Sequence, residues 1–473
     1  MKTIIEPFRT KVVEAIRFTN RAERQSLLER AHYNLFQLRA EDTIIDLLTD
    51  SGTSAMSSEQ WSALMKADES YAGCSSFYRF EKSVQDITGL PIVIPVHQGR
   101  AAERLLFEEL LKKGDIVPSN THFDTTRANI EKLSARALDL PCEENSDPGS
   151  EFPFKGNIDL EALSKLLEAE SEKIPFIMLT VTNNAAGGQP VSMENLIGLS
   201  KIAKRYKKKL FLDAARFAEN AYLIKRREPG MSDRQVSSIV KQLFAFCDGC
   251  LVSAKKDGLS NMGGFLALRD EVLASRLKAS LVISEGFPTY GGLAGRDLET
   301  VSQGLREVID EDYLQYRLAS ASYLANGLLA NDIPIVTPPG MHAIYLDARR
   351  FFPDISPEQM PGQALVCELY LEGGIRSCEI GTLMFSKTRK DGLQEPGRQD
   401  LVRLALPRRV YSQSHYDYVI EAVCLVFARR DEISGLRIDW EPEQLRHFSA
   451  RMSKLPRLSK KSEKANKGKL ACP

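Results

Sequence analysis

The sequence predicts an α/β fold, with a large domain built on a mostly parallel sheet and a smaller α+β domain. Residues 174–182 form a short, apolar, β-branched run, which is typical of a strand buried on both faces. Residues 192–209 have apolar side chains at helical spacing behind a Ser–Glu capping pair, and 209–214 again indicate a strand. Strand, helix and strand in this order predict a βαβ unit, in which the strands are parallel.

Further segments extend this pattern. Residues 157–172 predict a helix before the first strand, and 249–254 predict another buried strand. Beyond about residue 310, strands become shorter and loops longer, which favours an α+β layer; the segments concerned are 312–332, 333–351, 374–385 and 401–411. We therefore expect an N-terminal segment 1–50 packed with the small domain, a large domain 51–310, a small domain 311–453 and a disordered Lys-rich tail 454–473.

Composition narrows the class of protein. Lys plus Arg total 63, as do Asp plus Glu, so the net charge of zero gives no general attraction to nucleic acid or an anionic membrane. No apolar stretch is long enough to span a bilayer, and the charged N-terminus does not look like a secretory signal. The sparse cysteines fit a reduced, cytoplasmic protein. Cys247 and Cys250 form a lone CxxC with no further ligands nearby, so we expect a helix-end and a strand residue rather than a zinc site.

Polar residues follow the predicted strands, at the edge where parallel sheets bind ligands. They are Gln98, Gly99, Arg100, Asn184, Asp213, Arg216, Ser253, Lys255 and Lys256. Each has a plainer explanation when taken alone: Asp213 could be a helix cap, Asn184 a turn residue and the paired lysines a solvated turn. His97 is expected to be structural.

Together these residues favour pyridoxal phosphate. This cofactor requires a phosphate cradle, an acid for its ring nitrogen and a lysine for a Schiff base. Backbone N–H groups at 98–100 with an arginine suit the phosphate, and Asp213 suits the ring nitrogen. Of the paired lysines, Lys255 would lower the pKa of Lys256 by like-charge repulsion. No GxGxxG, HExxH or P-loop motif is present, which disfavours dinucleotide, zincin and nucleoside triphosphate sites.

The chain also resembles the β-eliminating lyases, the family of tryptophanases and tyrosine phenol-lyases. The resemblance runs from about residue 30 to 451 and rests on matched blocks in the same order. The blocks are LLTDSGT (47–53), ADESYAG (67–73), HQGR (97–100), FDTTR (123–127), AGGQPVS (186–192), DAARFAENAYLIK (213–225), SAKKD (253–257), YGGLAGRD (290–297), PRRVY (407–411) and EPEQLRHFSAR (441–451). It implies an aminotransferase-like fold of type I that binds pyridoxal phosphate, and a homotetramer of dimers with shared active sites.

The resemblance also implies roles for single residues around the cofactor. Lys256 would form the Schiff base, and Asp213 would face the ring nitrogen. Phe123 would stack on the ring, while Asn184 and Arg216 would meet its phenolic oxygen. The phosphate ligands would be Gln98, Gly99, Arg100, Ser253 and Lys255.

Roles toward the substrate and a metal ion follow in the same way. Arg408 would hold the substrate carboxylate, helped by Thr49 and Ser51. Tyr71 of a second subunit would protonate the leaving group. Potassium or a similar monovalent ion would bind through Glu69 and the backbone carbonyls of Gly52 and Asn261.

Three places near the side-chain pocket favour release of indole over release of phenol. By this resemblance, Ile380 occupies a position where phenol-lyases have an arginine, and His447 and Phe448 occupy the positions of two phenylalanines. Asp124 after Phe123 is also tryptophanase-like, and it or His447 would accept the indole N–H. The block SAMSSEQW (54–61) favours the phenol branch instead, but pocket residues set specificity.

The predicted reaction therefore converts L-tryptophan and water to indole, pyruvate and ammonia. Lys256 would remove the Cα proton, and Arg408 and Phe448 would contact the substrate. The alternatives are phenol release from tyrosine, a third aromatic leaving group, and a non-catalytic descendant with a relic cofactor site.

Overall fold

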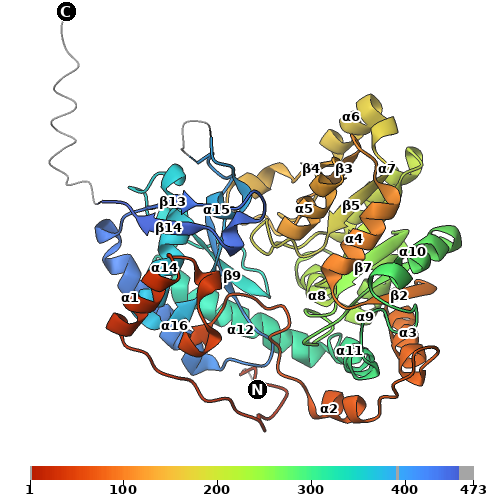
Figure 1. Ribbon diagram of the computed structural model, residues 1–473, viewed down its shortest axis with the longest axis horizontal. Coiled ribbons are helices and arrows are strands. Elements are labelled where there is room, and N and C mark those ends of the chain that lie inside the picture. The colour runs from red at the N-terminus through yellow and green to blue at the C-terminus, as the bar shows by residue number, and fades with distance from the viewer. Residues whose placement is uncertain (1–2, 390–393, 457–473) are drawn as a thin grey trace, which may run out of the picture. The chain divides into compact units, whose positions relative to one another are not determined.

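The computed structural model of the chain describes residues 3–389 and 394–456 (Figure 1). The chain forms two compact units. Unit 1 comprises the described residues of 1–15, 47–345 and 403–417. Unit 2 comprises those of 16–46, 346–402 and 418–473. Both units are therefore assembled from segments that are distant in the sequence.

The central sheet of unit 1 has the strand order β2-β8-β7-β6-β5. The strands are β2 (Ile92–Val96), β8 (Gly264–Leu268), β7 (Gly249–Ser253), β6 (Lys209–Asp213) and β5 (Phe176–Thr180). Strands β5, β6 and β7 run parallel, and β8 pairs antiparallel with both β7 and β2. The mostly parallel sheet predicted from the sequence is confirmed.

Both faces of this sheet are buried, which explains the unbroken apolar strands. Ile177 and Leu179 of β5 belong to one core cluster, while Phe176 and Met178 belong to another. Helices that contribute to the first cluster are α3 (Ser75–Thr88), α6 (Leu160–Glu170), α7 (Met193–Arg205), α8 (Phe217–Arg227), α9 (Val236–Ala245), α11 (Gly295–Glu307) and α12 (Glu311–Leu329). Those that contribute to the second are α4 (Gly99–Leu110), α5 (Asp124–Lys132) and α10 (Glu271–Ser284). Alternating side chains thus point to opposite helical layers.

Unit 2 contains shorter strands. Its described strands form the pair β1 (Ile45–Asp46) with β10 (Ile375–Arg376), the sheet β11 (Cys378–Ile380), β12 (Leu401–Ala405) and β9 (Ala343–Asp347), and the hairpin β13 (Leu436–Trp440) with β14 (Arg451–Lys454). Its helices include α1 (Arg21–Arg30), α13 (Ala348–Phe351), α14 (Pro361–Gly373), α15 (Thr382–Phe385), most of α16 (Gln413–Ala428) and the short 3-10 helices η1 (Leu35–Gln37), η2 (Ala40–Asp42) and η7 (Arg446–Phe448). Strands β9 and β12 and helix α16 run across the unit boundary.

The division differs from the predicted boundary at residue 310. Residues 311–345 and 403–417 belong to the large unit, and 16–46 belong to the small one. Tyr313 and Leu314 of α12 are buried in the same core cluster as β5 and β6, so this helix completes the large core. Strand β14 continues to Lys454, and the remainder of the predicted tail, from 457, lies outside the described residues.

No helix in the described part of the chain is long and apolar enough to cross a membrane. Cys247 lies just after α9 and Cys250 lies in β7, as expected, and both are buried. Among residues 3–389 and 394–456, no group of three or more His, Cys, Asp or Glu could hold a metal ion.

The side chain of Asn120 links a second parallel pair, β3 (Ile116–Ser119) with β4 (Arg136–Asp139), to the end of β5 in the central sheet. Asn120, which is buried, follows β3, and its Nδ2 donates to the carbonyls of Gly156 at 2.7 Å and Thr180 at 2.9 Å. Its Oδ1 accepts the N–H of Thr180 at 3.0 Å. This amide therefore completes the backbone hydrogen bonding at the end of β5.

We expect Asn120→Ala to destabilise the protein, because it leaves buried backbone groups of Thr180 and Gly156 without partners. Each such group costs about 1–3 kcal/mol. Urea denaturation should show a lower midpoint than for the wild type. Asn331→Ala is the matched control, since Asn331 is exposed and makes one bond of 2.8 Å to the carbonyl of Gly327, and it should change stability by less than about 0.5 kcal/mol. Equal midpoints for the two variants would contradict this role of Asn120.

Candidate active site

The sheet brings several of the predicted residues to one edge of unit 1. Thr180 at the end of β5 is paired with Asp213, and Asp213 is paired with Leu251 of β7. Ser253 is paired with Gly264 of β8, and Gly264 is paired with Val96 of β2. The carboxyl ends of β2, β5, β6 and β7 therefore lie together, and the segments that follow them carry the polar residues identified in the sequence.

The start of α4 has the properties of an anion site. Gly99 is the first residue of this twelve-residue helix, and a Cβ atom there would lie 2.7 Å from the Cβ of Ser253. Only glycine allows this approach of the helix N-terminus to the end of β7. Burial lowers the pKa of Lys255, and the positive charge of Arg100 lowers it further, so the two cations are neighbours. Helix N–H groups, a hydroxyl and two cations in one place suit a phosphate.

Lys256 and Asp213 interact at the same edge. Burial lowers the pKa of Lys256 to about 8, and the charge of Arg216 adds to this effect. Burial raises the pKa of Asp213, while Lys256 opposes that rise. Lys255 was expected to lower the pKa of Lys256, but the charge of Arg216 lowers it more. The result is an amine that loses its proton near neutral pH beside a partly desolvated carboxyl group.

The side chain of Asn184 is oriented by three donors. Its Oδ1 accepts from the Tyr345 hydroxyl at 2.6 Å and from Arg403 Nη1 at 3.0 Å, and it lies 3.2 Å from His342 Nε2. Its Nδ2 is buried and has no hydrogen-bond partner among the described residues. An amide held in this way presents a free N–H donor, which suits an oxygen atom of a ligand.

The structure contradicts the assignment of Arg408 to the substrate carboxylate. Arg408 is 0% exposed, and its guanidinium donates to Asp50 at 3.0 Å, Glu219 at 3.0 Å and Asp257 at 2.9 Å. Its Nε has no hydrogen-bond partner among the described residues, but both terminal nitrogens are already bonded to carboxylates, so the charge of Arg408 is compensated within the protein. Sequence pattern alone did not separate it from Arg403, which stands five residues earlier.

Arg403 is the better candidate for that role. It lies in β12, next to Asn184, and its Nη2 donates to the carbonyl of Leu48 at 2.6 Å, directly before Thr49. Its Nε is buried and has no hydrogen-bond partner among the described residues. The signal in the sequence was a single arginine inside the apolar run LVRLA, where an unpaired charge is costly.

Thr49 and Ser51 flank a buried acid. The N–H of Ser51 donates to Thr49 Oγ1 at 3.1 Å, and between them Asp50 binds Arg216 through Nε at 2.9 Å and Nη2 at 2.7 Å. Burial alone would raise the pKa of Asp50, but Arg216 and Arg408 hold it well below its usual range. This ion pair fixes the direction of Arg216.

Other predicted residues of unit 1 lie on its surface or at helix starts. Tyr71 is 69% exposed, and its ring centroid lies 5.5 Å from that of Phe287 and 5.6 Å from that of Tyr290. Phe123 precedes α5, and the buried Asp124 begins this helix with its Oδ1 accepting the N–H of Thr125 at 2.6 Å.

The proposed metal ligands have protein partners. Glu69 accepts the N–H of Gly295 at 2.8 Å at the start of α11, and Asn261 Nδ2 donates to the carbonyl of Gly52 at 2.9 Å. The contact between Gly52 and Asn261 agrees with their predicted place at one ion site, whereas Glu69 is bonded to Gly295 in a different segment. The monovalent ion therefore stays a prediction.

Of the residues predicted to decide the leaving group, Ile380, His447 and Phe448 lie in unit 2, whereas Asp124 lies in unit 1. Ile380 ends β11 and is buried. His447 is buried in η7, and its ring centroid lies 4.0 Å from that of Phe448 and 5.9 Å from that of Phe36. These rings form an aromatic group within the small unit.

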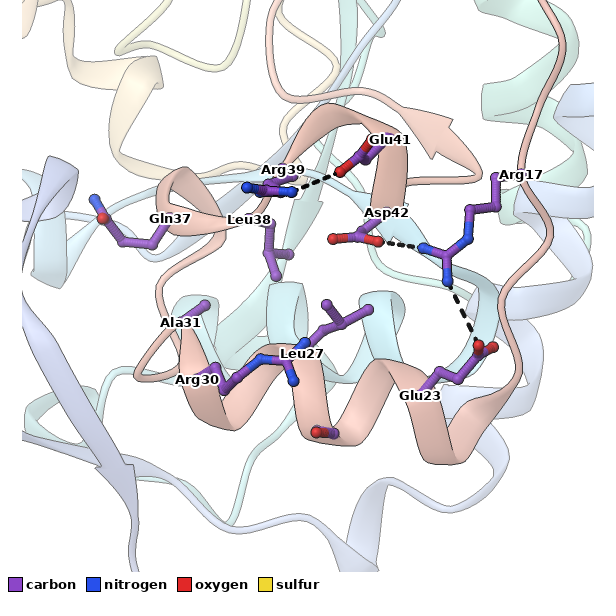
Figure 2. A pocket seen from close by; sticks show the side chains of 11 residues that line it. Arg17, Glu23, Leu27, Arg30, Ala31, Gln37, Leu38, Arg39, Glu41 and Asp42 are labelled. Carbon is purple, nitrogen blue, oxygen red and sulfur yellow. Dashed lines mark hydrogen bonds and ion pairs between the residues drawn. The ribbon is translucent and has the colours of Figure 1, made fainter.

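Unit 2 also has a groove of about 610 Å³ beside α1, which contains none of the predicted residues (Figure 2). Most of its charged side chains pair with one another: Arg17 contacts Asp42 and lies 3.5 Å from Glu23, and Arg39 lies 2.9 Å from Glu41 (Figure 2). Arg30 also lines the groove, so it contains three arginines and three carboxylates. Because these charges already compensate each other, the groove offers no strong preference for a charged ligand.

The fold and the site define a class of enzyme that uses pyridoxal phosphate. A solved structure of a SepCysS–SepCysE N-terminal domain complex contains a chain with a TM-score of 0.55 and 15% identity, covering 83% of this chain and 96% of that one. At this identity the similarity concerns the fold alone, and it agrees with the predicted fold of type I.

The chain belongs to the beta-eliminating lyase family, whose model matches residues 46–422. Tryptophanases of Hyphomonas neptunium and Rhodobacter capsulatus are 57% and 53% identical to it, each over 455 residues, which is 96% of this chain and 100% of those proteins. A tyrosine phenol-lyase of Symbiobacterium thermophilum is 46% identical over 447 residues, covering 94% and 98%. Membership in this family implies pyridoxal phosphate as cofactor.

The lowered pKa makes Lys256 identifiable in the cofactor-free protein. At pH 8 about half of a lysine with a pKa near 8 is neutral, whereas a solvated lysine with a pKa of about 10.4 is neutral in under about 1% of molecules. We expect an amine-acylating reagent used in limiting amount to label Lys256 with a pH midpoint near 8. Peptide mapping across pH measures this midpoint, and exposed Lys165 serves as control. A midpoint of Lys256 equal to that of Lys165 would refute the desolvated site.

Proposed function

We propose that the protein is a tryptophan indole-lyase, which converts L-tryptophan and water to indole, pyruvate and ammonia. The observation that carries this proposal is the full-length identity of 53–57% to three tryptophanases, against 45–46% to tyrosine phenol-lyases. Ile380, His447 and Asp124 support it, since these positions differ from the phenol-lyase pattern. Tyrosine phenol-lyase activity is the alternative.

The residues of the sheet edge fit pyridoxal phosphate. The absence of a Cβ atom at Gly99 lets the start of α4 approach Ser253 at the end of β7, and the buried Nδ2 of Asn184, which has no hydrogen-bond partner among the described residues, can donate to a ligand oxygen. When bound, the cofactor supplies an electron sink for the pair left at Cα. The residues proposed to hold it are Gln98, Gly99, Arg100, Phe123, Asn184, Asp213, Arg216, Ser253, Lys255 and Lys256.

The side chains around that site have distinct tasks. Lys256, whose pKa is lowered to about 8, takes the Cα proton of the substrate. Arg403 binds the substrate carboxylate together with Thr49 and Ser51, which orients the Cα–H bond. Asp213, as a carboxylate, keeps the ring nitrogen protonated. This assignment replaces Arg408 by Arg403, because the terminal nitrogens of Arg403 bond the neutral oxygens of Asn184 and Leu48, whereas those of Arg408 bond carboxylates.

The leaving group requires a proton and an apolar surface. Tyr71 of a second copy delivers a proton to the indole carbon that was bonded to Cβ. Its exposure of 69% beside Phe287 and Tyr290 supports a role across a subunit interface. His447 or Asp124 accepts the indole N–H, and Ile380 and Phe448 cover the flat ring.

We also propose the assembly and ion that this role of Tyr71 entails. Two copies share their active sites, and two such dimers form a homotetramer. A potassium or similar monovalent ion binds Glu69 with the carbonyls of Gly52 and Asn261, which the close approach of Gly52 to the carbonyl oxygen of Asn261 supports. The protein acts in the cytoplasm on a free amino acid.

Release of indole against release of phenol tests the proposal. A buried phenolic oxygen beside Ile380 would lack a donor, a loss of about 1–3 kcal/mol, so we expect tryptophan to be cleaved well and tyrosine poorly. Assays of indole, phenol, pyruvate and ammonia release measure the cleavage of both amino acids. His447→Phe should reduce kcat/KM for tryptophan more than for S-methylcysteine, whose leaving group needs no indole contact. A higher kcat/KM for tyrosine would support the alternative, and protein that binds no cofactor would support a non-catalytic descendant.

Replacement of Arg403 tests the revised carboxylate site. Loss of a desolvated arginine–carboxylate pair costs about 2–5 kcal/mol, so Arg403→Gln should lower kcat/KM at least about thirtyfold for every amino-acid substrate. Steady-state kinetics with tryptophan and S-methylcysteine measures this, and Arg437→Gln is the control, since Arg437 is exposed and pairs only with neighbours in its hairpin. An unchanged kcat/KM in Arg403→Gln would place the carboxylate elsewhere.

A further inference from the structure

Arg408 lies at the centre of a buried group of charges in unit 1. Its Nη1 donates to Asp50 Oδ2 at 3.0 Å and to the Asp50 carbonyl at 3.2 Å. Its Nη2 donates to Glu219 at 3.0 Å and Asp257 at 2.9 Å. Arg216 and Arg317 bind the same acids, so three arginines face three carboxylates.

Two of these acids stand beside residues of the site. Asp50 lies between Thr49 and Ser51, the segment proposed to help bind the substrate carboxylate. Asp257 follows Lys256 directly, and its other oxygen accepts the N–H of Ala218 at the start of α8, at 2.7 Å. The guanidinium of Arg408 therefore joins the carboxylate segment to the lysine segment.

Backbone hydrogen bonds support the same connection. The N–H of Gly52 donates to the carbonyl of Lys255 at 2.7 Å, and the N–H of Ala55 donates to the carbonyl of Arg408 at 3.0 Å. Asp50 also directs Arg216, so a shift of Asp50 would displace this side chain as well. Only a planar fork with several donors can hold acids from three separate segments at once.

We infer that Arg408 is a positioning residue, which sets the distance between the 49–51 segment and Lys256 through Asp50 and Asp257. The inference rests on the proposed function, since it concerns the residues that hold the substrate and remove its proton. Arg408 touches neither substrate nor cofactor. Its effect on turnover follows from geometry, because displacement of reacting groups by about 1 Å can cost on the order of a hundredfold in rate.

Two variants separate the geometry of Arg408 from its charge. Arg408→Lys keeps the charge and loses the fork, so we expect kcat to fall about a hundredfold with KM changed by less than about threefold. Arg408→Gln also removes the charge and leaves an excess of buried carboxylates near Lys256. In the cofactor-free protein, the pH midpoint for acylation of Lys256 should therefore rise in Arg408→Gln and stay near the wild-type value in Arg408→Lys. Arg409→Lys is the control, because Arg409 pairs with Glu307 at 2.8 Å. This substitution should change none of these quantities.

The outcomes that overturn the inference are distinct. A raised KM with unchanged kcat in Arg408→Lys would show that Arg408 binds the substrate itself. If Arg408→Gln changes neither kcat nor the pH midpoint for acylation of Lys256, the buried charges around Arg408 only stabilise the fold. If Arg408→Lys does not fold, the double variant Arg408→Gln/Asp257→Asn, which removes one charge of each sign, takes its place. A normal kcat in the double variant would overturn the inference. If the wild type cleaves no amino acid, the proposed function fails. The pH midpoint for acylation of Lys256 still tests the link between Arg408 and Lys256 in that case.

Discussion

The buried ion cluster around Asp50, Arg216 and Arg408 is the interaction on which the site depends most. These side chains come from three segments that are far apart in the sequence, and all three are buried. Loss of one partner from such a cluster leaves an uncompensated charge in a poorly solvated place, which is strongly destabilising. The cluster therefore holds the segment before Gly52, the start of α8 and the segment after β12 in one arrangement.

Desolvation sets the chemistry at the sheet edge. The same burial lowers the pKa of Lys256 and raises that of Asp213, so both groups are shifted toward their neutral forms without a ligand. A bound cation beside Asp213 would reverse the shift of that carboxyl group. The site thus combines a ready base with an acid that becomes fully charged in the presence of a positively charged ring, which is the pairing that pyridoxal phosphate chemistry requires.

The fold was predicted from the sequence where local pattern determines it. Short apolar runs identified β5, β6 and β7 because strands buried on both faces have no alternation of polar residues. The predicted boundary at 310 differs from the division in the structure, because the apolar residues of α12 recur at helical spacing whichever core the helix joins. Only packing places Tyr313 and Leu314 in the large unit.

The sequence by itself determined the residue types and their position at strand ends: a lysine pair after β7, an aspartate closing β6 and glycine at the start of α4. These follow from local order along the chain. Only the tertiary structure decided which arginine is free to bind an anion. Arg403 lies within the apolar strand β12 and Arg408 follows it, but the terminal nitrogens of Arg403 bond the neutral oxygens of Asn184 and Leu48. Those of Arg408 are held by the carboxylates of Asp50, Glu219 and Asp257. Those acids lie more than a hundred residues from Arg408 along the chain, so no local pattern could reveal that its charge was already compensated.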